Sequence, residues 1–292
     1  MPVLLPSTIE ETLRGLEENP RSILLAGGTD LMVALNHGHR RLDESTTVIV
    51  LGGVAEFRQW TVDLVSSTIR IGSGVTWREL ADEPFTTFTR ALAEAARTVG
   101  SPQIRTAGTI GGNLATSSPA GDGLGPLCAL DAVVEIVGPR GLRRVPYTDF
   151  ATGPKTTVLG SDEVLTAVEI PIVRGWQGYA KVGVRNAMVI ATASVTVVAD
   201  AERRSVAIAL GSVGPTVLRC PEAEHLSAAM FPWEGGPVDP DALDDVVAAV
   251  QRTARPIDDH RSSAQYRRHA VGVLAGRMLV RAANGLDRTE PT

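Results

Sequence analysis

The chain has 292 residues, of which 43% are hydrophobic and 21% are charged, the balance of a protein with a packed core. This length predicts more than one compact unit. The net charge of -5, without a basic run, argues against nucleic acid as the main partner. No apolar run is long enough to span a bilayer, and no export signal is found at the start. We therefore expect a cytoplasmic protein with reduced thiols.

The first hundred residues predict alternating strands and helices. Ser7-Thr8-Ile9-Glu10 has the form of a capping box, which predicts a short helix that runs to about Glu17. A strand over 21–25 ends at Gly27-Gly28, and a second helix begins at Thr29. The further elements expected here are strands at 47–51 and 69–73, a helix capped by Thr76 and Glu79, and an amphipathic helix over 88–99.

The segment from Gly100 to Gly125 is rich in Gly, Ser, Thr and Pro, and has neither helical nor strand periodicity. We predict an irregular segment here. A long irregular segment inside a compact domain is usually functional or disordered, and the apolar ends of this one are not typical of a linker.

The remainder of the chain predicts strands first and helices afterwards. Strands are expected at 133–137, 164–170, 191–199 and 206–213, the last two joined in a hairpin by Asp200 to Arg204. A domain boundary is predicted between Val173 and Gly178. Two helices follow, one that begins after Asp239-Pro240 and one after Ser262. This order indicates an α/β region followed by a small α+β unit.

Two glycine-rich segments are candidates for binding an anion. Ala26-Gly27-Gly28-Thr29-Asp30-Leu31 lies between a strand and a helix, where main-chain N–H groups can converge on phosphate oxygens. The alternative is a tight structural turn with a Thr cap. The pattern differs from G-x-G-x-x-G, which disfavours a Rossmann domain.

The second segment runs from Thr106 to Ala115 and has glycines at 108, 111 and 112. These glycines, flanked by small hydroxyl residues, suit a main-chain cradle for phosphate. Asp122 follows shortly afterwards in the sequence, and an acidic side chain there can accept hydrogen bonds from ribose hydroxyls. The alternative is a structural loop with glycines at its turns. Two such segments favour a ligand that carries two phosphates.

Together with Ile71-Gly72-Ser73-Gly74-Val75-Thr76, these segments resemble the FAD-binding subunits of molybdenum hydroxylases, such as the medium chain of carbon monoxide dehydrogenase. The resemblance covers nearly the whole chain. It implies an α+β protein with a vanillyl-alcohol-oxidase (PCMH-type) FAD-binding domain over 1–174, made of two α/β subdomains at about 1–55 and 56–174. A C-terminal α+β domain over 175–285, of the CO dehydrogenase flavoprotein type, and a tail over 286–292 would follow.

The resemblance also implies a set of residues that bind FAD without a covalent bond. The first glycine segment would wrap the pyrophosphate from one side and Thr109 to Asn113 from the other. Asp122 would bind ribose, Leu165 would lie by the isoalloxazine, and Lys181 would approach the flavin ring. The full set is Ala26, Gly27, Gly28, Thr29, Asp30, Leu31, Ala107, Thr109, Ile110, Gly111, Gly112, Asn113, Thr116, Asp122, Leu165 and Lys181.

The function implied is electron transfer from iron–sulfur clusters through FAD to NAD, oxygen or a quinone. Cys128 and Cys220 are too few for an iron–sulfur cluster or a four-ligand zinc site. The resemblance implies that molybdopterin resides on a large partner subunit and [2Fe-2S] clusters on a small one, in a dimer of heterotrimers. Two alternatives are a free-standing FAD oxidase of the same fold and a scaffold that has lost FAD.

Other residues that could carry chemistry have simpler interpretations. His37 and His39 flank Gly38 with no carboxylate beside them, which favours a solvated loop over a metal site. Cys128 lies in an apolar segment typical of an inert buried thiol. We predict no catalytic residue and no metal ligand in this chain.

Overall fold

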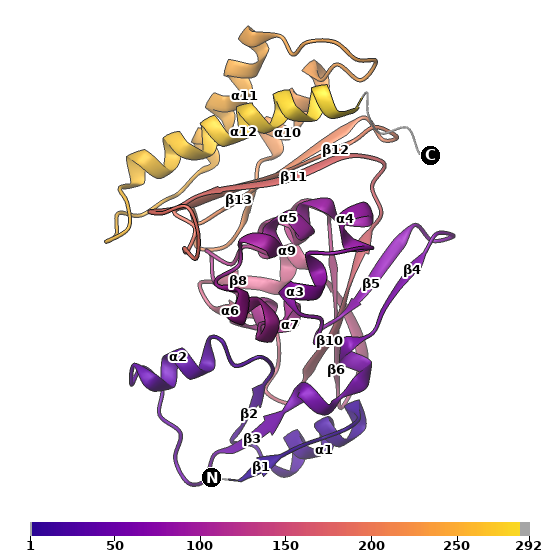
Figure 1. Ribbon diagram of the computed structural model, residues 1–292, viewed down its shortest axis with the longest axis vertical. Helices are drawn as coiled ribbons and strands as arrows, with labels where there is room; N and C mark the ends of the chain where they lie inside the picture. The colour runs from indigo at the N-terminus through magenta and orange to yellow at the C-terminus, as the bar shows by residue number, and fades with distance from the viewer. Residues whose placement is uncertain (1, 287–292) are drawn as a thin grey trace.

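The chain folds into three tiers, which Figure 1 shows stacked along the long axis of a computed structural model that describes residues 2–286. The N-terminal tier holds a small parallel sheet, the middle tier an antiparallel sheet flanked by short helices, and the C-terminal tier an antiparallel sheet covered by three helices. The tail predicted at 286–292 lies outside the described residues, apart from the end of the last helix.

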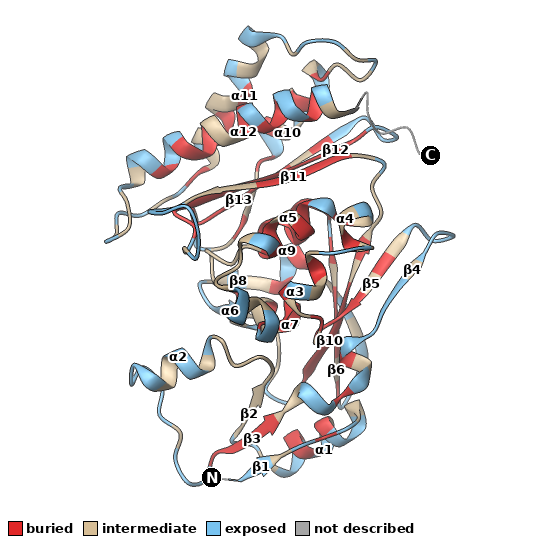
Figure 2. Cartoon of the chain, viewed as in Figure 1, coloured by how far each residue is buried: buried red, intermediate tan, exposed pale blue. Residues whose placement is uncertain are grey.

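The N-terminal tier is a three-stranded parallel sheet in the order β1-β3-β2. Its elements are β1 (Val3–Leu4), α1 (Ile9–Glu18), β2 (Ser22–Leu25), α2 (Leu31–Asn36) and β3 (Thr47–Val50), followed by the 3-10 turns η1 (Leu51–Gly53) and η2 (Ala55–Arg58). The cap of α1 is Thr8, whose hydroxyl accepts from the N–H of Glu11, so the capping box expected from Ser7 was placed one residue early. Helix α2 has no buried residue and projects from the tier, as Figure 2 shows.

The middle tier is built on a five-stranded antiparallel sheet whose central strand lies between two long partners. In spatial order its strands are β4 (Trp60–Asp63), β5 (Thr68–Gly72), β10 (Val164–Pro171), β6 (Val133–Gly138) and β7 (Gly141–Pro146); β8 (Ala151–Gly153) and β9 (Thr156–Thr157) form a separate hairpin. Strand β10 is buried along most of its length because it pairs on both edges and packs on both faces. The largest apolar core of the protein lies around this strand.

Short helices cover this sheet: α3 (Trp77–Leu80), α4 (Phe85–Phe88), α5 (Arg90–Thr98), α6 (Pro102–Ala107), α7 (Ile110–Thr116), α8 (Leu124–Ala129) and α9 (Tyr147–Phe150). The capping box expected at Thr76 and Glu79 is confirmed. The expectation of an irregular segment over 100–125 is wrong, because α6, α7 and the start of α8 lie within it. Side-chain hydroxyls of Ser101 and Thr109 cap the first two, so these helices form without the apolar periodicity of a longer helix.

The C-terminal tier is a four-stranded antiparallel sheet with helices on one face. Its elements are β11 (Gly175–Val182), β12 (Ala193–Asp200), β13 (Ser205–Gly211), β14 (Leu218–Arg219), α10 (Pro221–Met230), α11 (Pro240–Thr253) and α12 (Ala264–Leu286). The hairpin at Asp200 and the helix start at Pro240 are confirmed. The expectation of two helices misses α10, and strand β11 begins within the segment expected as a boundary.

The opposite face of this sheet packs on the middle tier through specific polar contacts as well as apolar ones. The N–H of Tyr179 in β11 donates to Glu94 of α5 at 2.9 Å, and the Gln177 side chain donates to the carbonyl of Phe88 at 3.2 Å. Arg219 donates to the carbonyl of Cys128 at 3.1 Å and pairs with Asp131. The C-terminal tier is therefore fixed against helices α4, α5 and α8 of the middle tier. Among the described residues, no helix is long and apolar enough to cross a membrane.

We predict that Asp259→Asn destabilises the C-terminal tier at neutral pH. Asp259 accepts from the buried Arg267 guanidinium at 2.6 Å, and Arg267 in turn donates to the carbonyls of Thr192 and Ser212. Burial raises the pKa of Asp259, but the N–H groups of Arg261 and Ser262 and the Arg267 charge outweigh it and hold that pKa below its usual value. Loss of the carboxylate leaves a buried charge unpaired, which costs about 3 kcal/mol of unfolding free energy.

The contribution of Asp259 to the free energy of unfolding depends on pH. A depressed folded-state pKa contributes stability that is complete above the unfolded value, about 3.9, and is lost as the pH falls toward the folded value. Urea unfolding of both proteins should therefore show a difference that is largest near neutral pH and shrinks below about pH 4. A difference that stays constant into acid would contradict this role of the carboxylate.

We also predict that neither cysteine reacts while the protein is folded. Cys128 and Cys220 are buried, and burial raises the pKa of each thiol to about 12. The thiolate is the reactive form, so a thiol reagent at neutral pH should label neither residue in the native state and both after unfolding in urea. Rapid labelling of either native thiol would show that the segment around it opens readily.

Candidate cofactor site

A cavity of about 720 Å³ lies where the three tiers meet. Its walls come from the turn between β2 and α2, from α7 and the segment after it, from β10, and from the loop between β11 and β12. All of the residues expected to bind the cofactor line this cavity except Ala107, Ile110 and Lys181. The fold thus brings together both glycine segments, which are about eighty positions apart in the sequence. Contact of these residues with a cofactor remains a prediction.

The turn at Gly27-Gly28 needs glycine at both positions, for different reasons. A Cβ atom at Gly27 would lie 1.7 Å from the carbonyl oxygen of Ala107, so any side chain would force the two segments apart. Gly28 has φ of +69°, a conformation that costs residues other than glycine about 1 kcal/mol. A tight structural turn and an anion-binding turn would therefore both need glycine at these two positions.

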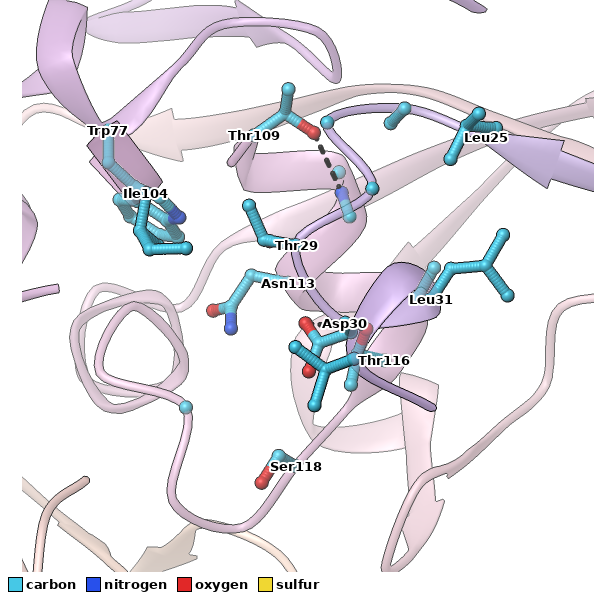
Figure 3. A pocket seen from close by; sticks show the side chains of 18 of the residues that line it. Leu25, Thr29, Asp30, Leu31, Trp77, Ile104, Thr109, Asn113, Thr116 and Ser118 are labelled. Atoms are coloured by element: carbon cyan, nitrogen blue, oxygen red, sulfur yellow. Dashed lines mark hydrogen bonds between the residues drawn. The ribbon is translucent and has the colours of Figure 1, made fainter. Parts of the chain in front are cut away.

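The main-chain donors of this turn point to a ligand. Within residues 2–286, the N–H groups of Gly27, Gly28, Thr29 and Asp30 have no acceptor in the chain. Gly27, Gly28 and Thr29 are partly buried, and N–H groups in such positions normally find a partner. A row of N–H groups in a turn forms a concave anion site. Figure 3 shows the side chains of Thr29 and Asp30 beside helix α7 in this part of the cavity. An anion with several oxygen acceptors fits these donors.

The second glycine segment is arranged differently from the expected main-chain cradle. The N–H groups of Ile110, Gly111, Gly112 and Asn113 all have acceptors, namely the carbonyls of Val75, Ser73 and Thr109 and the Thr109 hydroxyl. These bonds hold the start of α7 against the middle sheet, and the dashed line in Figure 3 marks the one to the Thr109 hydroxyl. This segment is therefore a rigid wall of the cavity, because its main-chain N–H groups already donate to acceptors within the protein.

Gly111 and Gly112 have separate roles within that wall. A Cβ atom at Gly111 would lie 2.5 Å from the Cβ of Ser73, so this glycine permits close packing on the sheet. A Cβ atom at Gly112 would be 3.2 Å from the Thr109 hydroxyl oxygen and 4.0 Å from the Cβ of Ala26. Gly112 thus faces the first glycine turn across the cavity, and its missing side chain leaves space there.

Asn113 carries a polar atom that lacks a partner in the described part of the chain. Its side-chain oxygen is buried and has no hydrogen-bond donor, although the residue lines the cavity. A buried acceptor left unpaired costs about 1–3 kcal/mol, so a hydroxyl or N–H group of a ligand at this position would be stabilising. This orphaned oxygen and the free N–H groups of the first turn fit a cofactor that has both phosphates and hydroxyls.

Asp122 and Lys181 form a buried ion pair behind this part of the cavity. The Lys181 ammonium donates to Asp122 Oδ2 at 2.6 Å, the Tyr179 hydroxyl donates to Oδ1 at 2.7 Å, and the paired side chains are only 8–9% exposed. Burial raises the pKa of Asp122, opposed by the Lys181 charge. Asp122 lines the cavity as expected for a ribose ligand, but both of its oxygens already accept from the protein. Lys181 does not line the cavity.

Apolar side chains also line the cavity. Leu165 and Val164 come from β10 and Leu159 from the segment before it, and Met188, Val189 and Ile190 come from the β11–β12 loop. An apolar wall of this kind suits a flat aromatic ring system. These three loop residues are not predicted as cofactor ligands from the sequence, although an apolar run inside an otherwise polar loop is a signal that could have indicated them.

The histidine loop after α2 contributes one edge of the cavity. The rings of His37 and His39 stack at 5.9 Å, and His39 and Arg40 line the cavity. The solvated loop expected here is exposed over these residues. No group of three or more potential metal ligands occurs in the part of the chain that the structure describes.

Comparison with known proteins identifies both parts of the chain. Residues 1–173 match the family described as the FAD binding domain in molybdopterin dehydrogenase, and residues 179–282 match the CO dehydrogenase flavoprotein C-terminal domain. The putative xanthine dehydrogenase FAD-binding subunit XdhB of Escherichia coli K12 is 30% identical over 289 residues, 96% of each chain. The nicotine 6-hydroxylase medium subunit of Paenarthrobacter nicotinovorans is 32% identical over 282 residues, 95% of each chain.

The solved structures agree with these matches. A chain of the CO dehydrogenase from Oligotropha carboxidovorans superposes with a TM-score of 0.86 at 27% identity, over 98% of both chains. The α+β fold implied by the resemblance is thereby confirmed. With both halves matched and relatives at 30% identity or more over nearly the full length, the chain belongs to the FAD-binding medium subunits of the molybdenum hydroxylases, which are flavoprotein subunits of oxidoreductases.

Proposed function

We propose that the cavity binds FAD without a covalent bond, with its diphosphate at the Gly27–Asp30 turn. The observation that carries this proposal is the row of four main-chain N–H groups that have no acceptor among residues 2–286, in a turn that lines a cavity built by all three tiers. Such donors bind phosphate oxygens well because they are fixed before the ligand arrives. The bare face of Gly112 would leave room for the same diphosphate on the opposite side.

The remaining cavity residues would fix the rest of the cofactor. The orphaned oxygen of Asn113 would accept from a hydroxyl group, and the apolar wall around Leu165 would cover the isoalloxazine. Asp122 would bind ribose only where a hydroxyl can share an oxygen that already accepts from Lys181 or Tyr179. Neither cysteine lines the cavity, which is consistent with non-covalent binding.

We propose further that this chain passes electrons within a larger enzyme. Bound FAD accepts electrons singly and releases them in pairs, which is the chemistry of a relay between one-electron and two-electron carriers. A large molybdopterin subunit and a small [2Fe-2S] subunit would complete the enzyme, as a dimer of heterotrimers. The printed names of the relatives, which call them subunits or medium chains, support such an assembly. Two buried, unpaired thiols fit the reducing cytoplasm.

The substrate of the complete enzyme is not encoded in this chain under the proposed function. Relatives of similar identity are named after xanthine, nicotine, nicotinate, glyceraldehyde, carbon monoxide and caffeine. A chain that determined the substrate would be expected to differ more strongly between such unlike molecules. The electron acceptor, whether NAD, oxygen or a quinone, would meet the cofactor through the open side of the cavity.

Gly112→Val tests the proposed cofactor site. The branched side chain would project toward Ala26 into the space assigned to the diphosphate, so FAD affinity should fall about 100-fold or more, the loss of two hydrogen bonds to a charged group. FAD retained after gel filtration, measured by flavin absorbance, and the FAD dissociation constant check this result. Gly52→Val is the matched control, because a side chain at Gly52 meets nothing within 4 Å.

In the control, flavin content should equal that of the wild type. A wild-type protein that is folded, colourless and unable to bind added FAD would refute the proposed site. Stoichiometric FAD in the folded Gly112→Val variant would refute the placement of the diphosphate.

Purification of the tagged chain from its native cells tests the proposed assembly. We expect a large chain that contains molybdopterin and a small one that contains [2Fe-2S] clusters to copurify in equal amounts, and mass spectrometry with metal analysis would identify them. Substrate oxidation by the isolated flavoprotein, without molybdenum, would instead support a free-standing oxidase.

A further inference from the structure

A second hollow lies on the C-terminal tier, where the end of α11 lies beside the start of α12. It has a volume of about 390 Å³, and its lining residues are Ala248, Gln251, Arg252, Ala254, Arg255 and Arg268. We refer to it as the arginine hollow. Both helices lie on the face of the C-terminal sheet that is turned away from the middle tier, as Figure 1 shows. The sheet therefore separates the arginine hollow from the cofactor cavity.

The charge of the arginine hollow is unbalanced. Three of its six lining residues are arginines and none is acidic. Arg252 pairs with Glu222 of α10 at 2.6 Å, but both side chains are 57% exposed, so water screens this pair. Arg268 is exposed and donates to no acceptor within residues 2–286. Like charges around one hollow repel one another, so a bound anion would relieve an unfavourable interaction.

Arg255 is held in place by the main chain around it. Its N–H donates to the carbonyl of Val213 at 2.7 Å, and its Nη1 donates to the three carbonyls of residues 252–254 at the end of α11. These carbonyls form the negative end of the helix, so the guanidinium offsets their partial charge. The Nε and Nη2 atoms of Arg255 have no acceptor in the described chain and are available to a ligand.

Gln251 adds an uncharged polar group to the same wall. A Cβ atom at Gly272 of α12 would lie 2.7 Å from the side-chain nitrogen of Gln251, so this amide packs on α12 where the glycine leaves room. The amide thus spans the two helices at a fixed position, and it donates to no acceptor among residues 2–286. Its N–H groups can donate to an oxygen atom of a ligand.

These features favour one ligand chemistry. A guanidinium presents parallel N–H donors that match two oxygens of a phosphate group at once, which an ammonium does not. The hollow has the size of a small-molecule site, which typically measures about 300–1,000 Å³. A concave site of this size suits a small phosphorylated molecule better than the surface of an acidic protein.

We propose that the arginine hollow binds a phosphate group through Arg252, Arg255 and Arg268, either as inorganic phosphate or as the phosphate of a small metabolite. The bound group would connect the end of α11, which carries the first two arginines, to α12, which carries the third. This site is separate from the cavity assigned to FAD, so the proposal does not depend on the proposed function.

The experiment is a calorimetric titration of the full-length chain, saturated with FAD, at about pH 8 and constant ionic strength, because salt screens exposed charges. Inorganic phosphate and adenosine monophosphate are the two probes. We expect saturable phosphate binding to the wild type and at least about tenfold weaker binding to Arg268→Gln, which loses a hydrogen bond from a charged donor. Since Arg268 donates to no acceptor in the described chain, Arg268→Gln should keep the unfolding temperature of the wild type.

Arg277→Gln is the matched control. It removes another exposed cation from α12, but Arg277 does not line the arginine hollow, so phosphate affinity should equal that of the wild type. Tighter binding of adenosine monophosphate than of inorganic phosphate, lost in Arg268→Gln, would identify a phosphorylated metabolite as the ligand. Equal or weaker binding, also lost in that variant, would identify free phosphate.

Glu222→Gln should have the opposite effect. This variant frees the Arg252 guanidinium from its exposed carboxylate partner, so phosphate affinity should rise about two- to fivefold. A fall in affinity would contradict the assigned role of Arg252.

Three results would overturn the proposal. The first is the absence of saturable phosphate binding; copurification of an acidic partner chain that Arg268→Gln weakens would then mark the hollow as a protein docking site. The second is an equal loss of affinity in Arg268→Gln and Arg277→Gln, which would indicate only diffuse charge. The third is binding that Arg268→Gln leaves unchanged, which would place the phosphate elsewhere. A wild type that binds no FAD would refute the proposed function, and the same comparison of variants would still test the arginine hollow.

Discussion

The cavity depends on the close approach of two main chains, at Gly27 and at Ala107. These segments belong to different tiers, and their contact is closer than any side chain would allow, since a Cβ atom at Gly27 would be 1.7 Å from the Ala107 oxygen. Gly108 continues this contact, because a Cβ atom there would lie 3.1 Å from Trp77 and 3.4 Å from the Thr29 hydroxyl. The N-terminal turn and helix α7 become opposite walls of one cavity only because these glycines carry no side chain.

The two walls then differ in how they use their main-chain donors. In the α7 wall, the N–H groups of residues 110–113 are bonded to the middle sheet and to Thr109, which makes that wall rigid. In the opposite wall, the N–H groups of residues 27–30 remain without acceptors in the described chain. Rigidity on one side and free donors on the other together give a preorganised anion site, in which little conformational entropy is lost on binding.

The sequence predicted the two glycine segments, their joint site and most of the sheet strands, because each depends on local signals. The sequence could not distinguish the roles of Gly111 and Gly112. Gly111 packs on Ser73 and Gly112 faces the cavity, but the residue type alone does not indicate which neighbour a glycine approaches. Helices α6 and α7 were missed because they are short and capped by Ser101 and Thr109, with too few turns to show an apolar period. Helix α10 buries only Ala223 and Ser227, so it also lacks a clear apolar stripe.

Lys181 shows why the role of a charged residue is the hardest to predict. Its acceptors Thr98, Asp122 and Val189 lie 83, 59 and 8 positions away, so the pattern of the sequence around Lys181 gives no sign of their convergence. The resemblance to the family predicts that this lysine approaches the flavin ring, whereas in the structure its ammonium donates to three acceptors of the protein and does not line the cavity. A buried ion pair costs more to desolvate than it often returns, so such a pair is better explained by the geometry it imposes than by stability.

The use of main-chain donors also suits the proposed function of this chain. An N–H group has no charge and does not titrate, so the hydrogen bonds that it donates to an anion do not depend on its own protonation state. Binding of an anion by main-chain N–H groups also does not depend on the identity of the side chains, apart from the glycines that shape the turn. A site that depends on a few glycines leaves most other positions free to vary, and the relatives named after unlike substrates share only about 30% of their residues with this chain.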